Sequence, residues 1–206
     1  QGKLYDLESD PGQYQDISKK MPKLTDRLRK AVADFKENVV AGYDDDRRPF
    51  VIGHPDYKYT QIPARDAKWT GVIKRSNKFP NCSYLSNWTS VDDKIFWPAK
   101  VPADGTFEVE IQYATRRADV GTVLELDFNG SKLRRKITDA HEVAERGWEH
   151  DRSGKRAESY VKTWRTIRMG RIKLKKGDGD LTLSALKIPG AAALDFRLLF
   201  LTRVDE

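Results

Sequence analysis

Hydrophobic and polar residues alternate along much of this chain, most clearly between residues 106 and 113. Phe107, Val109, Ile111 and Tyr113 fall on one face of an extended segment, and the residues between them are polar. A period of two is typical of a β-strand that is buried on one face only. The segment therefore predicts a strand at the surface of a hydrophobic core.

Similar extended segments recur at short spacing, separated by turn residues. The expected strands cover residues 69–75, 94–97, 106–113, 123–128, 133–137, 160–174, 181–185 and 196–204. Asn129-Gly130 stands between two alternating runs and is typical of a hairpin turn. Gly170 is expected to form a bulge or bend, and Trp97 is assigned to the core. About eight short strands with turns between them predict a mainly β fold of the sandwich type.

The first part of the chain has a different pattern. Leu4–Leu7 is predicted to be a short strand, and Asp10-Pro11-Gly12 a turn. Apolar residues then recur at helical spacing from Leu24 to Val39. This spacing predicts an amphipathic helix with Pro22 in its first turn and its end near Ala41-Gly42.

The segment LYDLESDPGQYQDISKKMP, followed by this helix, resembles the C-terminal end of a sulfatase of the arylsulfatase type. The resemblance covers about residues 3–41, although Gln13 stands where the family often has Glu. It implies a strand and closing helix of a small C-terminal subdomain that packs on a larger α/β catalytic domain. The partner would thus be a missing N-terminal catalytic domain of the same chain.

The second half, about residues 69–204, resembles a galactose-binding-like jelly-roll sandwich of the carbohydrate-binding-module type. The resemblance is carried by SNWTSVDDKIFWPAKVPADGTFEVEIQYA, DVGTVLELDFNGSKL and RAESYVKTWRTIRMGRIKLKKGDGDLTL. Such sandwiches are appended to some bacterial sulfatases. The expected organisation is residues 1–42 as the end of the sulfatase subdomain, 43–68 as a linker and arm, and 69–206 as the accessory sandwich.

Catalytic residues are not expected in this chain. A sulfatase uses an oxidised Cys or Ser (formylglycine) in a Cys/Ser-x-Pro-x-Arg motif beside Ca²⁺, and Cys82 lacks the Pro and Arg at that spacing. Formylglycine and Ca²⁺ are therefore implied only for the missing domain. No metal ligands stand out in the sandwich, and a structural Ca²⁺ there is left open.

The chain has no signal-peptide pattern at its N-terminus, and no apolar run approaches the roughly 20 residues that span a bilayer. We expect a fragment of an exported bacterial sulfatase, located in the periplasm or secreted. No membrane partner is expected.

The net charge of +7 is unevenly distributed. Residues 132–176 carry 15 Lys and Arg against 6 Asp and Glu, whereas residues 1–66 are balanced at 12 each. A basic region of this kind favours an anionic partner, such as a sulfated or other anionic polysaccharide, or consists of solvated strand exteriors.

Aromatic side chains on loops can cover the apolar C–H face of a pyranose, while nearby polar groups bind its hydroxyls. The candidates for carbohydrate binding are Trp148, Trp88, Trp69, Tyr160, Trp164, Asn87 and Glu158. The candidates for sulfate or other anion contacts are Arg134, Arg135, Lys136, Arg152 and Arg156.

Two roles follow for the sandwich of a sulfatase fragment: binding the substrate polysaccharide, or bracing the catalytic domain. A free-standing carbohydrate-binding module is the alternative. A nucleic-acid-binding domain is disfavoured, because no helix-turn-helix, RNA-recognition or zinc-finger pattern accompanies the high sequence pI of about 9.4.

Overall fold

The computed structural model describes residues 2–43, 47–79, 81, 83–147, 149 and 160–204. The chain forms two compact units, Gln1–Arg48 and Pro49–Glu206. Among the described residues, no helix has the length and hydrophobicity needed to cross a membrane.

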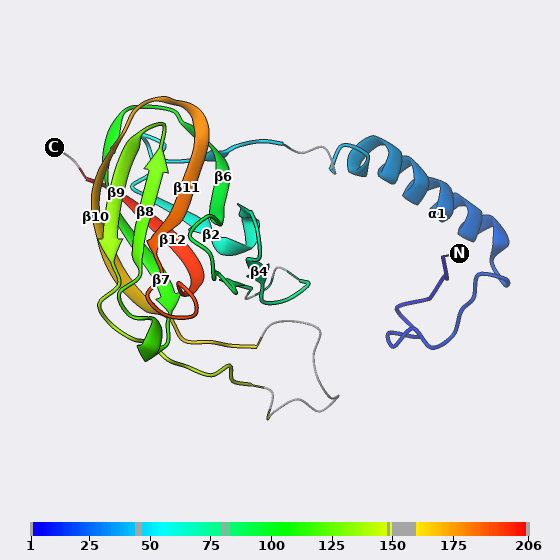
Figure 1. Ribbon diagram of the computed structural model, residues 1–206. Helices are drawn as coiled ribbons and strands as arrows, with labels where there is room; N and C mark the ends of the chain where they lie inside the picture. Colours follow the sequence, from blue (N-terminus) through cyan, green and yellow to red (C-terminus); the bar gives the residue numbers. More distant parts are fainter. Residues whose placement is uncertain are drawn as a thin grey trace. The chain divides into compact units, whose positions relative to one another are not determined.

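The first unit contains helix α1, Pro22–Phe35, which continues into a π-helical turn, Lys36–Val40 (Figure 1). This confirms the predicted helix and its end. Proline suits the first helical position, because the N–H that it lacks has no partner within the helix. The apolar side of the helix is largely open to solvent, with Val32, Phe35 and Val39 between 55% and 58% exposed.

The predicted strand at Leu4–Leu7 does not form. The Leu4 carbonyl accepts a hydrogen bond from the Ile17 N–H at 2.9 Å, and the Leu4 N–H donates to the Asp16 carboxylate at 3.2 Å. Side-chain and turn contacts take the place of a ladder, since no neighbouring strand is described in this unit.

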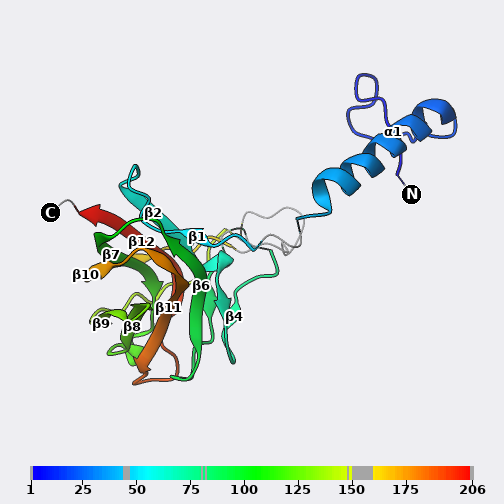
Figure 2. The ribbon, with the colours of Figure 1, turned by 90° about the horizontal axis from the view of Figure 1, so that it is seen from above.

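The second unit is a β-sandwich of two six-stranded sheets (Figures 1 and 2). Sheet A has the order β1-β6-β11-β8-β9, with β3 beside β6. Its strands are β1 (Phe50–Val51), β3 (Lys68–Trp69), β6 (Lys94–Val101), β8 (Val123–Phe128), β9 (Ser131–Lys136) and β11 (Gly177–Lys187).

Sheet B has the order β10-β7-β12-β5-β4, with β2 beside β12. Its strands are β2 (Tyr59–Pro63), β4 (Lys74–Arg75), β5 (Leu85–Ser86), β7 (Gly105–Ala114), β10 (Arg165–Leu174) and β12 (Asp195–Val204). Two 3₁₀ turns, Ala64–Asp66 and Arg117–Asp119, lie in the connections. The mainly β sandwich that the alternation predicts is confirmed.

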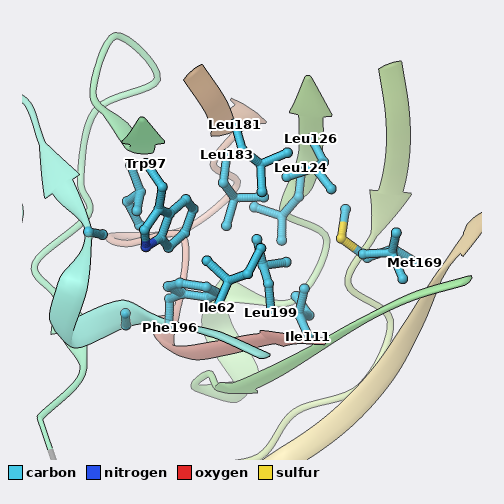
Figure 3. Packing of buried hydrophobic residues seen from close by; sticks show 14 of the residues in the cluster. Ile62, Trp97, Ile111, Leu124, Leu126, Met169, Leu181, Leu183, Phe196 and Leu199 are labelled. Carbon is cyan, nitrogen blue, oxygen red and sulfur yellow. The ribbon is translucent and has the colours of Figure 1, made fainter. Parts of the chain in front are cut away.

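The core lies between the two sheets (Figure 3). The predicted face of β7 points into it, with Phe107, Val109, Ile111 and Tyr113 at most 1% exposed. Trp97 of β6 is fully buried, as expected, and packs edge-on against Phe196 of β12 at a centroid distance of 5.8 Å. The predicted hairpin also forms, because β8 and β9 pair antiparallel and Asn129 and Gly130 have positive φ angles.

The predicted linker and arm, residues 43–68, need a correction. β1 pairs parallel with β6, and β2 pairs antiparallel with β12, so this segment adds a strand to each sheet. Ile52 and Ile62 are fully buried in the core. The hydrophobic residues of the arm belong to the sandwich, and the compact unit begins at Pro49.

The predicted strand at 69–75 is also corrected, because it is two short strands in different sheets. β3 pairs with β6, and β4 pairs with β5. Gly71, at φ +64°, turns the chain between them, and the Asp93 carboxylate accepts a hydrogen bond from the Val72 N–H at 3.0 Å. Only the glycine signals this break in the sequence.

Candidate functional site

A polar cleft of about 220 Å³ opens at one end of the sandwich. Four separate segments meet there: the end of β7, the loop after β9, the segment before β10 and the loop between β11 and β12. Its lining consists of Ala114, Thr115, Arg116, Asp119, His141, Glu142, Val143, Lys162, Ala192, Leu194 and Asp195.

Short backbone bridges fix the loops around this end cleft. Thr115 and His141 exchange two hydrogen bonds of 3.1 and 2.9 Å, which tie the loop after β9 to the end of β7. Arg146 and Val161 are paired in the same way, at 2.7 and 3.1 Å. The described part of this polar loop is thus held by backbone bridges and not by a named strand.

The Asp119 side chain, which is buried, holds the β11–β12 loop in place. Its Oδ1 accepts hydrogen bonds from the N–H groups of Ala191 and Ala192 at 2.7 and 3.3 Å, and its Oδ2 accepts one from Arg116 Nε at 2.6 Å. Burial alone would raise the pKa of Asp119, but the bonds from Arg116, Ala192 and Ala191 together lower it. The carboxylate therefore stays charged.

An aromatic and charged cluster stands beside the cleft. Tyr84 and Trp164 meet edge to face with ring centroids 5.1 Å apart. The Lys162 ammonium lies 4.8 Å from the Tyr84 ring and 5.6 Å from the Trp164 ring, and it donates to Asp195 Oδ2 at 2.5 Å. These cation–π contacts and the ion pair fix Lys162, whose side chain is only 10% exposed.

Tyr84 is buried and its hydroxyl donates to Glu145 Oε1 at 2.9 Å. Burial is the main cause that raises the pKa of Tyr84, and the hydrogen bond to Glu145 raises it further. The phenol therefore remains a neutral donor. Trp164, by contrast, is partly exposed.

Of the predicted carbohydrate contacts, Trp164 stands beside the cleft: it is not part of the lining, but its ring lies 5.6 Å from the ammonium of Lys162, which is. Trp88 is 1% exposed and its indole N–H donates to the Asp93 carbonyl at 3.2 Å, so it is a core residue and presents no ring face to a ligand. Tyr160 is likewise buried at 9% exposure, and Trp69 packs against the core from β3. The Asn87 amide donates to the Val72 carbonyl at 2.6 Å and holds a turn.

The structure describes three of the five predicted anion contacts, and all three are on one strand. Arg134, Arg135 and Lys136 are exposed on β9, outside the cleft lining. Trp148, Glu158, Arg152 and Arg156 lie outside the described residues. Among the described residues, no group of three or more His, Cys, Asp or Glu side chains is arranged to hold a metal ion.

Sequence reasoning missed Tyr84, Lys162, Glu145 and Asp195. Lys162 and Trp164 are two residues apart in an extended segment, a spacing that places side chains on one side of the backbone. The sequence therefore carries a signal that places Lys162 and Trp164 side by side. The pairing of Lys162 with Asp195 joins residues 33 apart and has no local signal.

A scan against protein-family models finds no match, and a search of curated proteins finds none either. Among solved structures, a β-1,3-glucan-binding CBM6 from Bacillus halodurans matches with a TM-score of 0.50 and 13% identity, covering 77% of this chain and all of that one. The Cry4Aa toxin from Bacillus thuringiensis matches with a TM-score of 0.53 and 12% identity, covering 77% of this chain and 25% of the toxin.

A GH26-CBM35 mannanase from Podospora anserina matches with a TM-score of 0.46 and 14% identity, over 72% of this chain and 28% of the enzyme. The chain thus spans about a quarter of the length of the toxin and of the mannanase. The likeness shows the fold, a jelly-roll sandwich of the kind found in carbohydrate-binding modules. A shared fold does not by itself establish a shared ligand.

Proposed function

We propose that the sandwich is a carbohydrate-binding module that holds a polysaccharide at the end cleft. The observation that carries the proposal is the partly exposed indole of Trp164 beside a polar cleft. The fold likeness to a β-1,3-glucan-binding module of Bacillus halodurans supports the same class of ligand.

The chemistry of the cleft suits a sugar. An indole face covers the apolar C–H surface of a pyranose, and the polar side chains around it bind the hydroxyl groups. Arg116 supplies donors, whereas Glu142 and Asp195 supply acceptors. Lys162 and Asp119 are themselves held by ion pairs, so the cleft is pre-organised and loses little conformational freedom on binding.

Replacing Trp164 by alanine is expected to weaken polysaccharide binding about tenfold or more, because the stacking surface is removed. The measurement is a screen of the purified chain on an array of neutral and sulfated glycans, followed by calorimetric titration of the best ligand. Trp69→Ala is the matched control, since it removes a partly buried indole from β3, whereas Trp164 contacts Lys162 of the cleft lining.

The proposal fails if the unaltered chain binds no glycan at millimolar concentration. Bracing of a neighbouring domain would then be the remaining role of the sandwich. If a glycan binds and Trp164→Ala and Trp69→Ala weaken it equally, the end cleft is not the site. Melting curves of both variants separate a loss of binding from a loss of folding.

We also propose that residues 1–42 close the C-terminal subdomain of a sulfatase, which would make the sandwich an accessory domain of an exported bacterial enzyme. The specific observation in favour is the apolar side of α1, where Leu28, Val32, Phe35 and Val39 are 41–58% exposed. Burial of this surface against a catalytic domain would be strongly favourable. Formylglycine and Ca²⁺ would belong to that domain.

The coding sequence upstream of Gln1 tests this second proposal, because it should encode a Cys/Ser-x-Pro-x-Arg motif several hundred residues earlier. In the full-length protein, Phe35→Asp should lower the melting temperature of the catalytic domain, because a charge would enter an apolar contact. The same change in the present chain should leave the sandwich transition unchanged. A free-standing binding module is the conclusion if no such motif is encoded.

A further inference from the structure

One side of the sandwich is formed by two edge strands that lie next to each other, β9 of sheet A and β10 of sheet B (Figures 1 and 2). The contact is close: the Leu133 side chain lies 3.1 Å from the position that a Cβ atom on Gly170 would take. The two sheets therefore meet along this side, in a strip formed by β9 and β10.

This strip is strongly basic. The β9 sequence SKLRRK and the β10 sequence RTIRMGRIKL contain eight basic residues and no acidic residue. All eight are exposed. We call them the edge cations: Lys132, Arg134, Arg135, Lys136, Arg165, Arg168, Arg171 and Lys173.

A β-bulge at Gly170 aligns the arginines of β10. Arg168 is opposite Glu110 and Arg171 is opposite Glu108, so the two arginines share a face although they are three residues apart. Regular alternation would place them on opposite faces. Gly170, at φ +137°, adopts a conformation that side chains rarely permit, and Leu133 fills the space above it.

Carboxylates on the neighbouring strands and loop neutralise part of this charge. Glu125 pairs with Lys132 at 3.2 Å and with Arg134 at 2.6 Å. Three further pairs are Asp127 with Lys132 at 3.2 Å, Asp139 with Arg165 at 3.4 Å and Glu108 with Arg168 at 2.9 Å.

Three edge cations have no ion pair within the described part of the chain: Arg135, Lys136 and Arg171. Of the pairs above, Arg165 with Asp139 joins two exposed side chains, and such a pair contributes little and exchanges readily. Within the described part of the chain, the strip therefore offers three cations outside any ion pair and a fourth, Arg165, that an incoming anion can recruit.

We propose that the edge cations bind the sulfate or carboxylate groups of an anionic polysaccharide. This inference rests on the proposed carbohydrate-binding function and adds the charge of the ligand. Arg165, the first residue of β10, directly follows Trp164, so the strip begins beside the residue that contacts Lys162 of the end cleft. Strand β10 has 10 residues, and a strand rises about 3.3 Å per residue. It is therefore long enough for several sugar units of one chain to lie along it.

The composition of the strip favours a polysaccharide over single-stranded nucleic acid. Neither β9 nor β10 contains an aromatic residue on which bases could stack. Guanidinium groups bind two oxygens of a sulfate or carboxylate group with two parallel hydrogen bonds, and five of the eight edge cations are arginines.

The test compares the binding of dextran sulfate and unmodified dextran to the whole chain. The triple variant Arg135→Gln, Lys136→Gln, Arg171→Gln is expected to bind dextran sulfate about tenfold more weakly, with a reduced dependence on salt. The matched control is Lys68→Gln, Lys94→Gln, Lys100→Gln, which removes the same charge from exposed positions of β3 and β6. The control should bind within about twofold of the unaltered chain.

Equal weakening by the two triple variants would overturn the proposal, because the binding would then follow net charge alone. The proposal would also be overturned if dextran sulfate bound no more tightly than unmodified dextran. A short DNA duplex that binds as tightly as dextran sulfate would overturn the assignment of the ligand class.

The two proposals fail separately. If neutral glycans bind and Trp164→Ala weakens them, but dextran sulfate has no advantage, the end cleft is the site and the strip is not. If the strip variant weakens dextran sulfate while Trp164→Ala changes the binding of no glycan, the strip stands and the cleft is overturned. Melting curves show that each variant is folded.

Discussion

Replacing Trp97 by alanine is expected to lower the free energy of unfolding of the sandwich by about 3–5 kcal/mol. Trp97 is fully buried on β6, and its ring packs against Phe196 of the opposite sheet (Figure 3). Its indole N–H donates to the Pro63 carbonyl at 3.2 Å. The substitution leaves a cavity between the sheets and removes the donor from that carbonyl.

A loss of this size is a large part of the roughly 5–15 kcal/mol that stabilises a typical domain. Urea unfolding followed by circular dichroism measures it, and the m-value should stay constant if only stability has changed. Trp69→Ala is the comparison, because Trp69 is only partly buried and should cost about 1–2 kcal/mol. Equal losses for the two variants would contradict the assignment of Trp97 as the central contact between the sheets.

The sandwich was predictable because its longer strands have one buried face and one face toward solvent. In β7 the buried residues alternate with Glu108, Glu110 and Gln112, so the period of two is visible in the sequence. Where a strand is very short, this signal is lost. β3 and β4 have two residues each and end in different sheets, which no alternation can show.

The prediction of a linker and arm at 43–68 is wrong for a related physical reason. Prolines at positions 55 and 63 remove backbone donors and are typical of loops or of strand ends. β2 tolerates Pro63 because it is the last residue of the strand, and Ile62 beside it is fully buried. The burial of Ile62 in the core outweighs the preference of the two prolines for loops.

The candidate site was predictable only in part. An aromatic residue with a solvent-accessible ring is a reasonable expectation for a sugar contact, and Trp164, partly exposed just before β10, fits it. Trp88 has the same local signals, but its indole is buried by packing that depends on distant residues. The end cleft consists of four segments, and their meeting is determined by sheet order rather than by any local pattern.

Replacing Asp119 by alanine is expected to cost about 2–4 kcal/mol and to weaken glycan binding at the end cleft. The substitution removes the acceptor from the N–H groups of Ala191 and Ala192 and from Arg116. Ala192 lines the cleft, so a loosened loop would also lose the geometry of the site. Urea unfolding and titration with the best glycan measure the two effects.

The contribution of Asp119 should depend on pH with a definite sign. Its pKa is lowered in the folded state, so the stabilisation is complete above the unfolded pKa of about 3.9 and is lost as the pH falls through the folded value. The difference in unfolding free energy between the unaltered chain and Asp119→Asn should therefore shrink below about pH 4.

Asp104 provides the control for the stability effect of Asp119→Ala. Its pKa is also lowered, first by a hydrogen bond from Lys175 and then by one from the Lys176 N–H, but its side chain is 56% exposed. Exposed pairs contribute little, so Asp104→Ala should change stability only slightly. If Asp119→Ala were as mild as Asp104→Ala, the buried carboxylate would not be what holds the β11–β12 loop against the cleft.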